Sequence, residues 1–286
     1  MAEGPGPLPT FLIVGAARSG STALYRHLRA HPDVFLPSRK EIHFFDHNWD
    51  RGIEWYRHFY AEASPHQARG EATPSYLYEP LAPARMADVV PEARLLAILR
   101  NPVDRAYSHY WLNRGQGREK LSFEEALEAE PQRLASGKGL AEGVQRRRWA
   151  YLDRGRYLVQ LQRLCDHFPR RSLLVLVFEH DLRSSPEATY ASVCRFIGVD
   201  DGFVAPQLAA PVNRPLAYRS MTVRRVAARL PQAMKPVKGA LTRVNARPIS
   251  YPPMEPGTRQ RLLAGYQGDN AELAAWLGRD LSIWGS

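Results

Sequence analysis

Cysteine is scarce in this chain of 286 residues, and no long apolar run is present. The two cysteines, Cys165 and Cys194, each lie in an apolar helical pattern, which favours buried thiols over a disulfide framework or a metal site. The longest uncharged apolar stretches, residues 11–17 and 172–178, are far too short to span a bilayer. The N-terminus also lacks the basic and apolar regions of a secretion signal. We therefore expect a cytoplasmic protein without a transmembrane segment.

Acidic residues are absent from the interval between Asp201 and Glu255. A basic block of this kind suits an anionic partner, such as a nucleotide, a polyanionic acceptor, a nucleic acid or an acidic membrane surface. It is equally compatible with a solvated basic helix, so the charge alone assigns no function. The nine cations of the interval nearly equal the formal net charge of +10, and they are Arg214, Arg219, Arg224, Arg225, Arg229, Lys235, Lys238, Arg243 and Arg247.

Short apolar runs alternate with helical patterns along the chain. Continuous apolar runs such as residues 94–99 are typical of buried strands in a parallel sheet. The alternation predicts an α/β protein, a three-layer P-loop-like fold with a central parallel sheet flanked by helices. We expect strands at 11–14, 34–36, 94–99 and 172–178, and helices at 23–30, 52–60, 83–90, 102–113, 124–130, 149–168, 186–197 and 256–277.

The chain is expected to form one domain. Its hydrophobic content of 44% suffices for a full core over residues 11–286, and the Pro- and Gly-rich residues 1–10 read as a flexible tail. The acid-free segment 202–254 is expected to act as a lid or as a contact for an anionic surface, with Met221 and Val226 on its apolar side.

A glycine-containing loop follows the first expected strand and leads directly into a helix. Strand, glycine loop and helix together present backbone N–H groups and a helix N-terminus to a phosphate group. The spacing Gly15…Gly20-Ser21-Thr22 nearly matches the loop of nucleoside-triphosphate enzymes, but Ser21 stands where that loop has lysine. A cation lies inside the loop instead, at Arg18. The loop predicts a nucleotide phosphate site that differs from an ordinary ATP or GTP site.

The second long strand ends in another cation. Arg100 follows residues 94–99, and Ser108 lies two helical turns further on. Since ligands of parallel sheets bind at the carboxyl ends of the strands, Arg100 is placed to hold a second phosphate. A kinase would normally place a magnesium-binding aspartate there. The competing interpretation of Arg100 is a structural ion pair with Asp104 or Glu71.

Four motifs resemble the PAPS-dependent sulfotransferases (PAPS is 3′-phosphoadenosine 5′-phosphosulfate), most closely the heparan sulfate N- and O-sulfotransferase branch and its bacterial relatives. The similarity continues through residues 154–157, 168–169 and 281–284, so it extends over most of the chain. In chain order the motifs are GAARSGST at 15–22, KEIHFFD at 40–46, EATPSY at 71–76 and LAILRNP at 96–102, the last followed by Ser108.

The resemblance implies a binding site for PAPS. Arg18 matches the position of the family's loop lysine, which neutralises charge on the bridging oxygen as the sulfuryl group leaves. Arg100 and Ser108 match the pair that holds the 3′-phosphate. The resemblance implies no metal. The 5′-phosphosulfate would lie against the backbone N–H groups of Ser19, Gly20, Ser21 and Thr22 and the hydroxyls of the last two.

The resemblance also implies an acceptor site around Glu41. Glu41 matches the general base that takes the acceptor proton, a role that partial burial would assist by raising its pKa. His43 and Asp46 match residues that position the acceptor or the base, and Thr73 lies in the acceptor-side motif. Alternatively, Glu41 is a surface partner of Lys40 or Arg39, and His43 is a hydrogen-bonded residue of the core wall.

Two departures from the family limit what carries over. Ala72 stands where the glycosaminoglycan branch has a lysine, which weakens the case for an acidic sugar polymer. The branch's C-terminal Lys-Gly-Arg loop is not evident, and Arg214, Arg219 or Arg247 could replace it.

We expect sulfuryl transfer from PAPS to a hydroxyl, less readily an amine, of a carbohydrate or small secondary metabolite. Nucleic acid is not an expected partner, and the oligomeric state stays open. The alternatives are a P-loop kinase that uses ATP and a non-enzymatic adaptor that binds polyanions or anionic membranes.

Overall fold

The computed structural model describes residues 6–135, 148–204, 216–218, 220, 222–223, 226–227, 230–231, 234–248 and 251–285. Its centre is a five-stranded sheet in the order β2-β3-β1-β4-β5, and every neighbouring pair is parallel. The strands are β1 (Phe11–Gly15), β2 (Val34–Phe35), β3 (Ala68–Ala72), β4 (Arg94–Leu99) and β5 (Leu173–Val177). The predicted central parallel sheet is confirmed.

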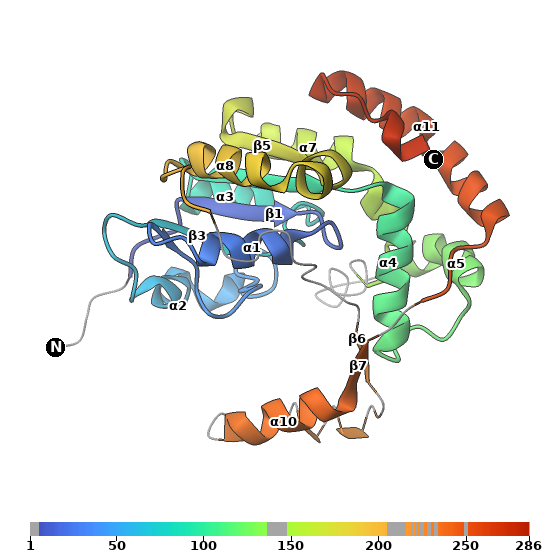
Figure 1. Ribbon diagram of the computed structural model, residues 1–286, viewed down its shortest axis with the longest axis horizontal. Coiled ribbons are helices and arrows are strands. Elements are labelled where there is room, and N and C mark those ends of the chain that lie inside the picture. Colours follow the sequence, from blue (N-terminus) through green and yellow to red (C-terminus); the bar gives the residue numbers. More distant parts are fainter. Residues whose placement is uncertain are drawn as a thin grey trace.

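Helices cover both faces of the sheet because its strands are apolar on both sides (Figure 1). Phe11 and Ile13 pack with α1 (Ser21–Arg29) and α8 (Pro186–Ile197). Leu12 and Val14, which alternate with them, point to the opposite face. The helices that pack there are α2 (Ile53–Arg57), α3 (Ala82–Val89), α7 (Tyr157–Cys165) and α11 (Pro256–Leu277).

A smaller core lies beside the sheet between α4 (Pro102–Gly115) and α5 (Phe123–Ala135). Ala106 and Tyr110 of α4 pack against Phe123 and Ala126 of α5 and against Tyr151. Pro102 occupies the first turn of α4, and the side chain of Asn101 caps that turn by accepting from the Val103 N–H. The helix therefore begins immediately after β4, and it holds Ser108 near the sheet edge.

Two predictions about secondary structure were wrong. β3 was not expected, although its strand pairs with both β1 and β2. The expected single helix over 149–168 is instead a 3-10 helix at Asp153–Gly155 followed by α7. The helix is interrupted where Gly155 approaches the side chains of Tyr266 and Pro102 so closely that an added Cβ would collide with both.

Short turns and one π-helix complete the described elements. The 3-10 helices comprise Trp49–Arg51, His58–Tyr60, Arg170–Ser172 and Ser282–Gly285, and the π-helix comprises Phe178–Ser184. Of the two free cysteines, Cys194 is buried as expected and Cys165 is half-buried. Among the described residues, no helix is both long and apolar enough to cross a membrane.

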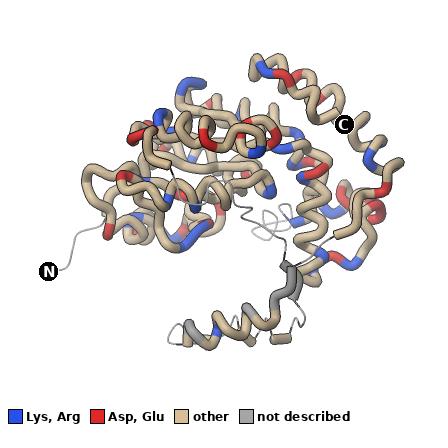
Figure 2. Tube along the Cα trace, viewed as in Figure 1, with Lys and Arg blue, Asp and Glu red and all other residues tan. Residues whose placement is uncertain are grey.

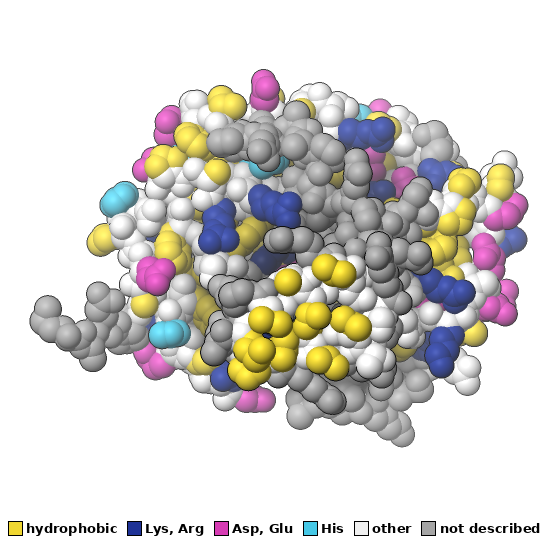
Figure 3. Space-filling view, turned by 60° about the horizontal axis from the view of Figure 1, so that its bottom comes forward, with side chains coloured by type: hydrophobic (Ala, Val, Ile, Leu, Met, Phe, Trp, Pro, Cys, Tyr) yellow, Lys and Arg dark blue, Asp and Glu magenta, His cyan; other side chains and the backbone are white. Residues whose placement is uncertain are grey.

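The basic segment contains a small antiparallel pair, β6 (Leu216–Tyr218) with β7 (Ala246–Pro248), and the helix α10 (Lys235–Asn245). Figure 1 shows α10 apart from the sheet, beyond the foot of α4. The tube of α10 contains no acidic residue (Figure 2). Hydrophobic side chains gather on its outer face (Figure 3), where Val237 and Val244 are 45% and 71% exposed. Arg214 and Arg219 lie outside the described residues, as does the side chain of Arg247, and the expected lid stays a prediction.

Candidate active site

The glycine loop joins β1 to α1 at the carboxyl edge of the sheet. Arg18 and Gly20 both have left-handed backbone conformations, with φ of 74° and 102°. A side chain at Gly20 would meet Phe178 and Leu182 at 3.1–3.2 Å, so the position suits glycine in space as well as in conformation. Gly20 is the N-cap of α1, and neither a side-chain cap nor an acidic residue occupies the first turn. The N-terminus of α1 thus has the character of an anion site.

Ser19 is bonded within the loop, and its expected contact with a phosphosulfate stays a prediction. Its N–H donates to the carbonyl of Ala16 at 3.3 Å, and its side chain is fully buried next to the hydroxyl of Tyr157. The N–H of Ser19 is therefore bonded within the turn, whereas its buried hydroxyl has no hydrogen-bond partner among the described residues. Ser21 and Thr22, by contrast, open the helix, and their expected contact with a phosphosulfate stays a prediction.

Arg18, Arg100 and Ser108 converge beside this helix end. Arg18 donates from Nε and Nη2 to the Ser108 hydroxyl at 3.1 and 3.0 Å. Arg100 donates from Nη1 to the carbonyl of Arg18 at 3.3 Å, and its guanidinium lies 5.4 Å from the ring centre of Phe178. Burial lowers the pKa of Arg18, and the neighbouring charges of Arg100 and Arg105 act in the same direction. The cluster therefore concentrates positive charge in a site with little water.

Neither carboxylate that was considered as a structural partner pairs with Arg100. Asp104 accepts from Arg259 at 2.7 Å, and Glu71 accepts from hydroxyl groups. Within the described ranges, no carboxylate lies within ion-pair distance of Arg100. Its guanidinium is held by a backbone carbonyl and an aromatic face, which leaves donor capacity for an anion.

A second loop, residues 41–48, lies at the same edge of the sheet, after β2. The Glu41 side chain is half-exposed, whereas Ile42, Phe44 and Phe45 are buried in the core. Glu41 and His43 adopt left-handed backbone conformations, with φ of 62° and 60°. The N–H of Glu41 donates to the carbonyl of Ala72 at 3.1 Å, so the loop is anchored to the end of β3.

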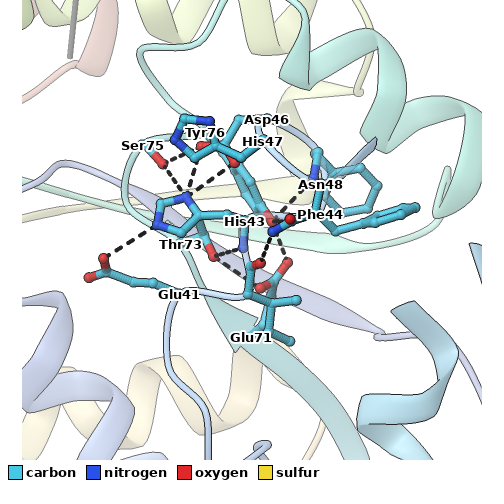
Figure 4. A network of polar contacts seen from close by, with 12 residues as sticks. Glu41, His43, Phe44, Asp46, His47, Asn48, Glu71, Thr73, Ser75 and Tyr76 are labelled. Carbon is cyan, nitrogen blue, oxygen red and sulfur yellow. Dashed lines mark hydrogen bonds and ion pairs between the residues drawn. The ribbon is translucent and has the colours of Figure 1, made fainter. Parts of the chain in front are cut away.

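Glu41, His43 and Asp46 form a chain of charged groups (Figure 4). His43 Nε2 lies 3.7 Å from a Glu41 oxygen, and His43 Nδ1 lies 3.0 Å from Asp46 Oδ2. Burial opposes a charge on His43, but these two carboxylates outweigh it and raise the pKa of His43 to about 9. The imidazole is therefore protonated at neutral pH and bridges the two acids.

The expected direction of the Glu41 pKa was wrong. Burial alone would raise the pKa, but the interactions with His43 and Lys40 outweigh it and lower the pKa of Glu41 to about 2. Lys40 Nζ lies 2.7 Å from Glu41 Oε1, so the alternative partner Lys40 is present together with His43. Arg39 instead lies over the ring of Phe59. Glu41 is thus an ionised carboxylate held between two cations.

The side chains of Asp46 and Thr73 are bonded to other protein groups, and their expected substrate contact stays a prediction. The Asp46 side chain is fully buried and accepts from the Ser75 hydroxyl and the His47 N–H, both at 2.6 Å. Thr73 is also fully buried, and its hydroxyl lies between Glu71 and the N–H of His43. Both residues contact His43, Asp46 through Nδ1 of the imidazole and Thr73 through the backbone N–H.

The side chain of Glu41, in loop 41–48, lies close enough to that of Arg18, in the glycine loop, for their charges to interact. The charge of Glu41 raises the pKa of Arg18, opposing the larger effect of burial. One cluster of metal-binding residue types is present among the described residues: potential ligand atoms of His43, Asp46 and His47 lie within 4.8 Å of one another. The Asp46 oxygens already accept protein hydrogen bonds there, and the expected absence of a metal stays a prediction.

A model of the sulfotransferase domain matches residues 8–211, well over half of the chain. The chain belongs to this family. It is 32% identical over 197 residues to human heparan sulfate glucosamine 3-O-sulfotransferase 3A1, a match that covers 69% of this chain and 46% of the relative. It is 34% identical over 203 residues to human bifunctional heparan sulfate N-deacetylase/N-sulfotransferase 3, covering 67% and 22%. The chain spans about half or less of the length of these curated relatives.

A solved sulfotransferase agrees over nearly the whole chain. The crystal structure of a sulfotransferase from Alicyclobacillus acidocaldarius superposes with a TM-score of 0.73 at 30% identity, and the match covers 97% of this chain and 99% of the other. The family predicted from the four motifs, its resemblance to heparan sulfate sulfotransferases and the P-loop-like fold predicted from the alternation of strands and helices are confirmed.

Sequence reasoning missed several residues of this sulfotransferase site. Ser75 holds Asp46, and Tyr76 donates to Glu71 beneath loop 41–48. A signal was available, because the motif at 71–76 contains hydroxyl groups at positions 73, 75 and 76. Without knowing that residues 68–72 form a strand, we could not tell which of those hydroxyls points toward the loop.

Proposed function

We propose that this sulfotransferase domain transfers a sulfuryl group from PAPS to a hydroxyl group, less readily an amine, of a carbohydrate or small-metabolite acceptor. The observation that carries the proposal is the convergence of Arg18, Arg100 and Ser108 at the ends of β1 and β4, next to the N-terminus of α1. Two cations, a hydroxyl and a helix N-terminus suit a ligand with two separate phosphate positions.

In this proposal, the donor's two anionic groups occupy two adjacent subsites. The 5′-phosphosulfate lies on the helix N-terminus at Ser21 and Thr22, and the 3′-phosphate lies at Arg100 and Ser108. Arg18 spans the two subsites. Its Nε and Nη2 donate to Ser108, which belongs to the 3′-phosphate subsite, and its Nη1 retains N–H groups for the 5′-phosphosulfate. These N–H groups would neutralise the charge that develops on the bridging oxygen as the S–O bond to the 5′-phosphate breaks.

Glu41 is the group we assign to receive the acceptor proton. As the acceptor oxygen forms its bond to sulfur, its proton passes to Glu41, and 3′-phosphoadenosine 5′-phosphate leaves with the electron pair of the broken S–O bond. A carboxylate with a pKa of about 2 is a weak base, so proton transfer follows sulfur attack closely rather than preceding it. His43 holds the Glu41 carboxylate in place through its charge.

The donor assignment is tested by thermal shift with 3′-phosphoadenosine 5′-phosphate and with 5′-AMP, which lacks the 3′-phosphate. We expect a larger stabilisation by the first ligand and loss of the difference in Arg100→Ala. Arg94→Ala is the matched control, because Arg94 begins the strand that Arg100 follows and its guanidinium contacts the carbonyl and ring of Phe196. Equal shifts for both ligands, or stronger stabilisation by ATP with Mg²⁺, would contradict the proposal and favour a kinase.

A further inference from the structure

Glu71 is a buried carboxyl group that the proposed reaction does not use. It lies in β3, is 1% exposed, and accepts hydrogen bonds from three hydroxyl groups. Tyr56 and Tyr76 donate to Oε1 at 2.9 and 2.8 Å, and Thr73 donates to Oε2 at 3.0 Å. In the described part of the chain, no cation lies within ion-pair distance of it. Burial of a carboxyl group is costly unless hydrogen bonds compensate it, and here three hydroxyl groups do so.

Two of the three hydroxyl groups connect Glu71 to the backbone of loop 41–48 (Figure 4). Tyr76 Oη accepts from the Phe44 N–H at 2.8 Å, and Thr73 Oγ1 accepts from the His43 N–H at 3.4 Å. A hydroxyl has one proton, so donating it to Glu71 turns the oxygen lone pairs toward these N–H groups. Burial raises the pKa of Glu71 to about 7, and in its ionised form the carboxylate fixes the orientation of both acceptors.

The third hydroxyl provides an internal comparison. Tyr56 donates to the same carboxylate oxygen and accepts from Tyr60, and no hydrogen bond joins its hydroxyl to loop 41–48. Its ring stacks on Phe44 with 4.3 Å between ring centres, a contact that phenylalanine at the position would preserve. Tyr56 and Tyr76 therefore have similar burial and the same acceptor, but only Tyr76 leads onward to the loop.

The loop needs such support because of its backbone. Glu41 and His43 have left-handed φ values, a conformation that costs about 1 kcal/mol or more for each residue that is not glycine. Conformations of this kind persist only where the surrounding structure holds them. The N–H groups of His43 and Phe44, which lie within this strained stretch, are the groups that the two hydroxyls bind.

We propose that Glu71 is a positioning residue that holds Glu41 and His43 toward the acceptor through the hydroxyls of Thr73 and Tyr76. This inference rests on the proposed function, since it assigns Glu71 to the acceptor half of the same site. The three hydrogen bonds that Glu71 accepts do not involve the donor half, where Arg18, Arg100 and Ser108 bind one another.

The test compares three variants that each remove one hydroxyl from Glu71 and keep the side-chain shape: Tyr76→Phe, Thr73→Val and Tyr56→Phe. We expect kcat to fall about tenfold in the first two, since small misplacement of reacting groups has effects of this size or larger. Tyr56→Phe should stay within about twofold of wild type. The KM for PAPS and the thermal shift with 3′-phosphoadenosine 5′-phosphate should not change in any of the three.

Hydrogen exchange of the peptide covering residues 41–48 gives a readout that needs no acceptor. Exchange should accelerate in Tyr76→Phe and Thr73→Val and remain at the wild-type rate in Tyr56→Phe. Equal acceleration in all three variants, or equal loss of kcat, would show that Glu71 contributes only general stability and would overturn the inference. Failure of the proposed function would look different, because wild type itself would then show no preference for the ligand that has the 3′-phosphate.

Discussion

The donor loop, residues 15–22, and the acceptor loop, residues 41–48, lie at the same edge of the sheet but are built in opposite ways. The donor side combines two arginines, a serine and a helix N-terminus, and no carboxylate takes part in its hydrogen bonds. The acceptor side alternates acids and cations, from Lys40 through Glu41 and His43 to Asp46. The donor side is thus organised to attract a polyanion, and the acceptor side to hold one carboxylate in a fixed place.

The difference predicts that the two sides fail in different ways. A change on the donor side should reduce binding of the phosphorylated ligand and the rate together. A change on the acceptor side should reduce the rate and leave ligand binding intact.

Glu41→Gln is expected to have the largest effect on turnover. The amide keeps the size of the side chain but cannot accept the proton, so we expect kcat to fall by about 10² to 10⁴. Stabilisation by 3′-phosphoadenosine 5′-phosphate should remain, as measured by thermal shift. Lys40→Ala is the control, because it removes the other cation beside Glu41 and leaves the carboxylate. Turnover that survives in Glu41→Gln would show that another group receives the proton.

Arg18→Ala is expected to have the second largest effect, with losses in both kcat and the thermal shift by 3′-phosphoadenosine 5′-phosphate. Removing the guanidinium takes away the charge next to the leaving group and the two hydrogen bonds to Ser108. We expect kcat to fall by about 10² to 10³ and the ligand-induced shift to shrink. Arg29→Ala, in the exposed last turn of the same helix, should change neither. A normal shift with reduced kcat would place Arg18 outside the ligand subsites.

The sequence revealed the donor side more fully than the acceptor side, for a physical reason. A phosphate loop is local, so the spacing of Gly15, Gly20 and Ser21 was enough to indicate its geometry. Arg100 was predictable because a parallel sheet brings strand ends together, whereas Ser108 was matched through the family resemblance. The motif at 40–46 identified Glu41 and His43, but the lowered pKa of Glu41 depends on distances that no spacing encodes.

Most of what the sequence did not predict about the site depends on β3, which was not expected to be a strand. Its sequence, ARGEA, is short, polar and contains glycine, so it does not look like a buried strand. The strand nevertheless lies inside the sheet, between β2 and β1, and Gly70 is required because the ring of Phe11 occupies the space of a side chain there. Without this strand, Glu71 could not be placed beneath the acceptor loop.

The pH dependence of stability sharpens the comparison, because only the acceptor side holds a histidine that bridges acids. The pKa of His43 is raised to about 9 from an ordinary 6.5, so its stabilising effect is complete below pH 6.5 and is lost as the pH rises through 9. The pKa of Glu41 is lowered to about 2 from an ordinary 4.5, so its effect is present above pH 4.5 and is lost as the pH falls toward 2.

We therefore expect the free energy of unfolding of wild type, relative to His43→Gln, to fall by about 2 kcal/mol between pH 6.5 and 9. This figure allows for the 27% exposure of the His43 side chain. Urea unfolding at the two pH values measures it. If both proteins lose the same stability over this range, His43 does not bridge the two carboxylates in solution.

Ser75→Ala and Ser108→Ala should have the smallest effects, and they separate the two sides most cleanly because each removes one buried hydroxyl. Ser75 donates to Asp46 at 2.6 Å, so its loss loosens His43 and should lower kcat about fivefold with an unchanged ligand shift. Ser108 accepts from Arg18, and its loss should weaken binding of 3′-phosphoadenosine 5′-phosphate about fivefold. Ser192→Ala, whose hydroxyl bonds within α8, should change neither quantity. If both site variants altered kcat and ligand binding equally, the two loops would act as one site without separate donor and acceptor halves.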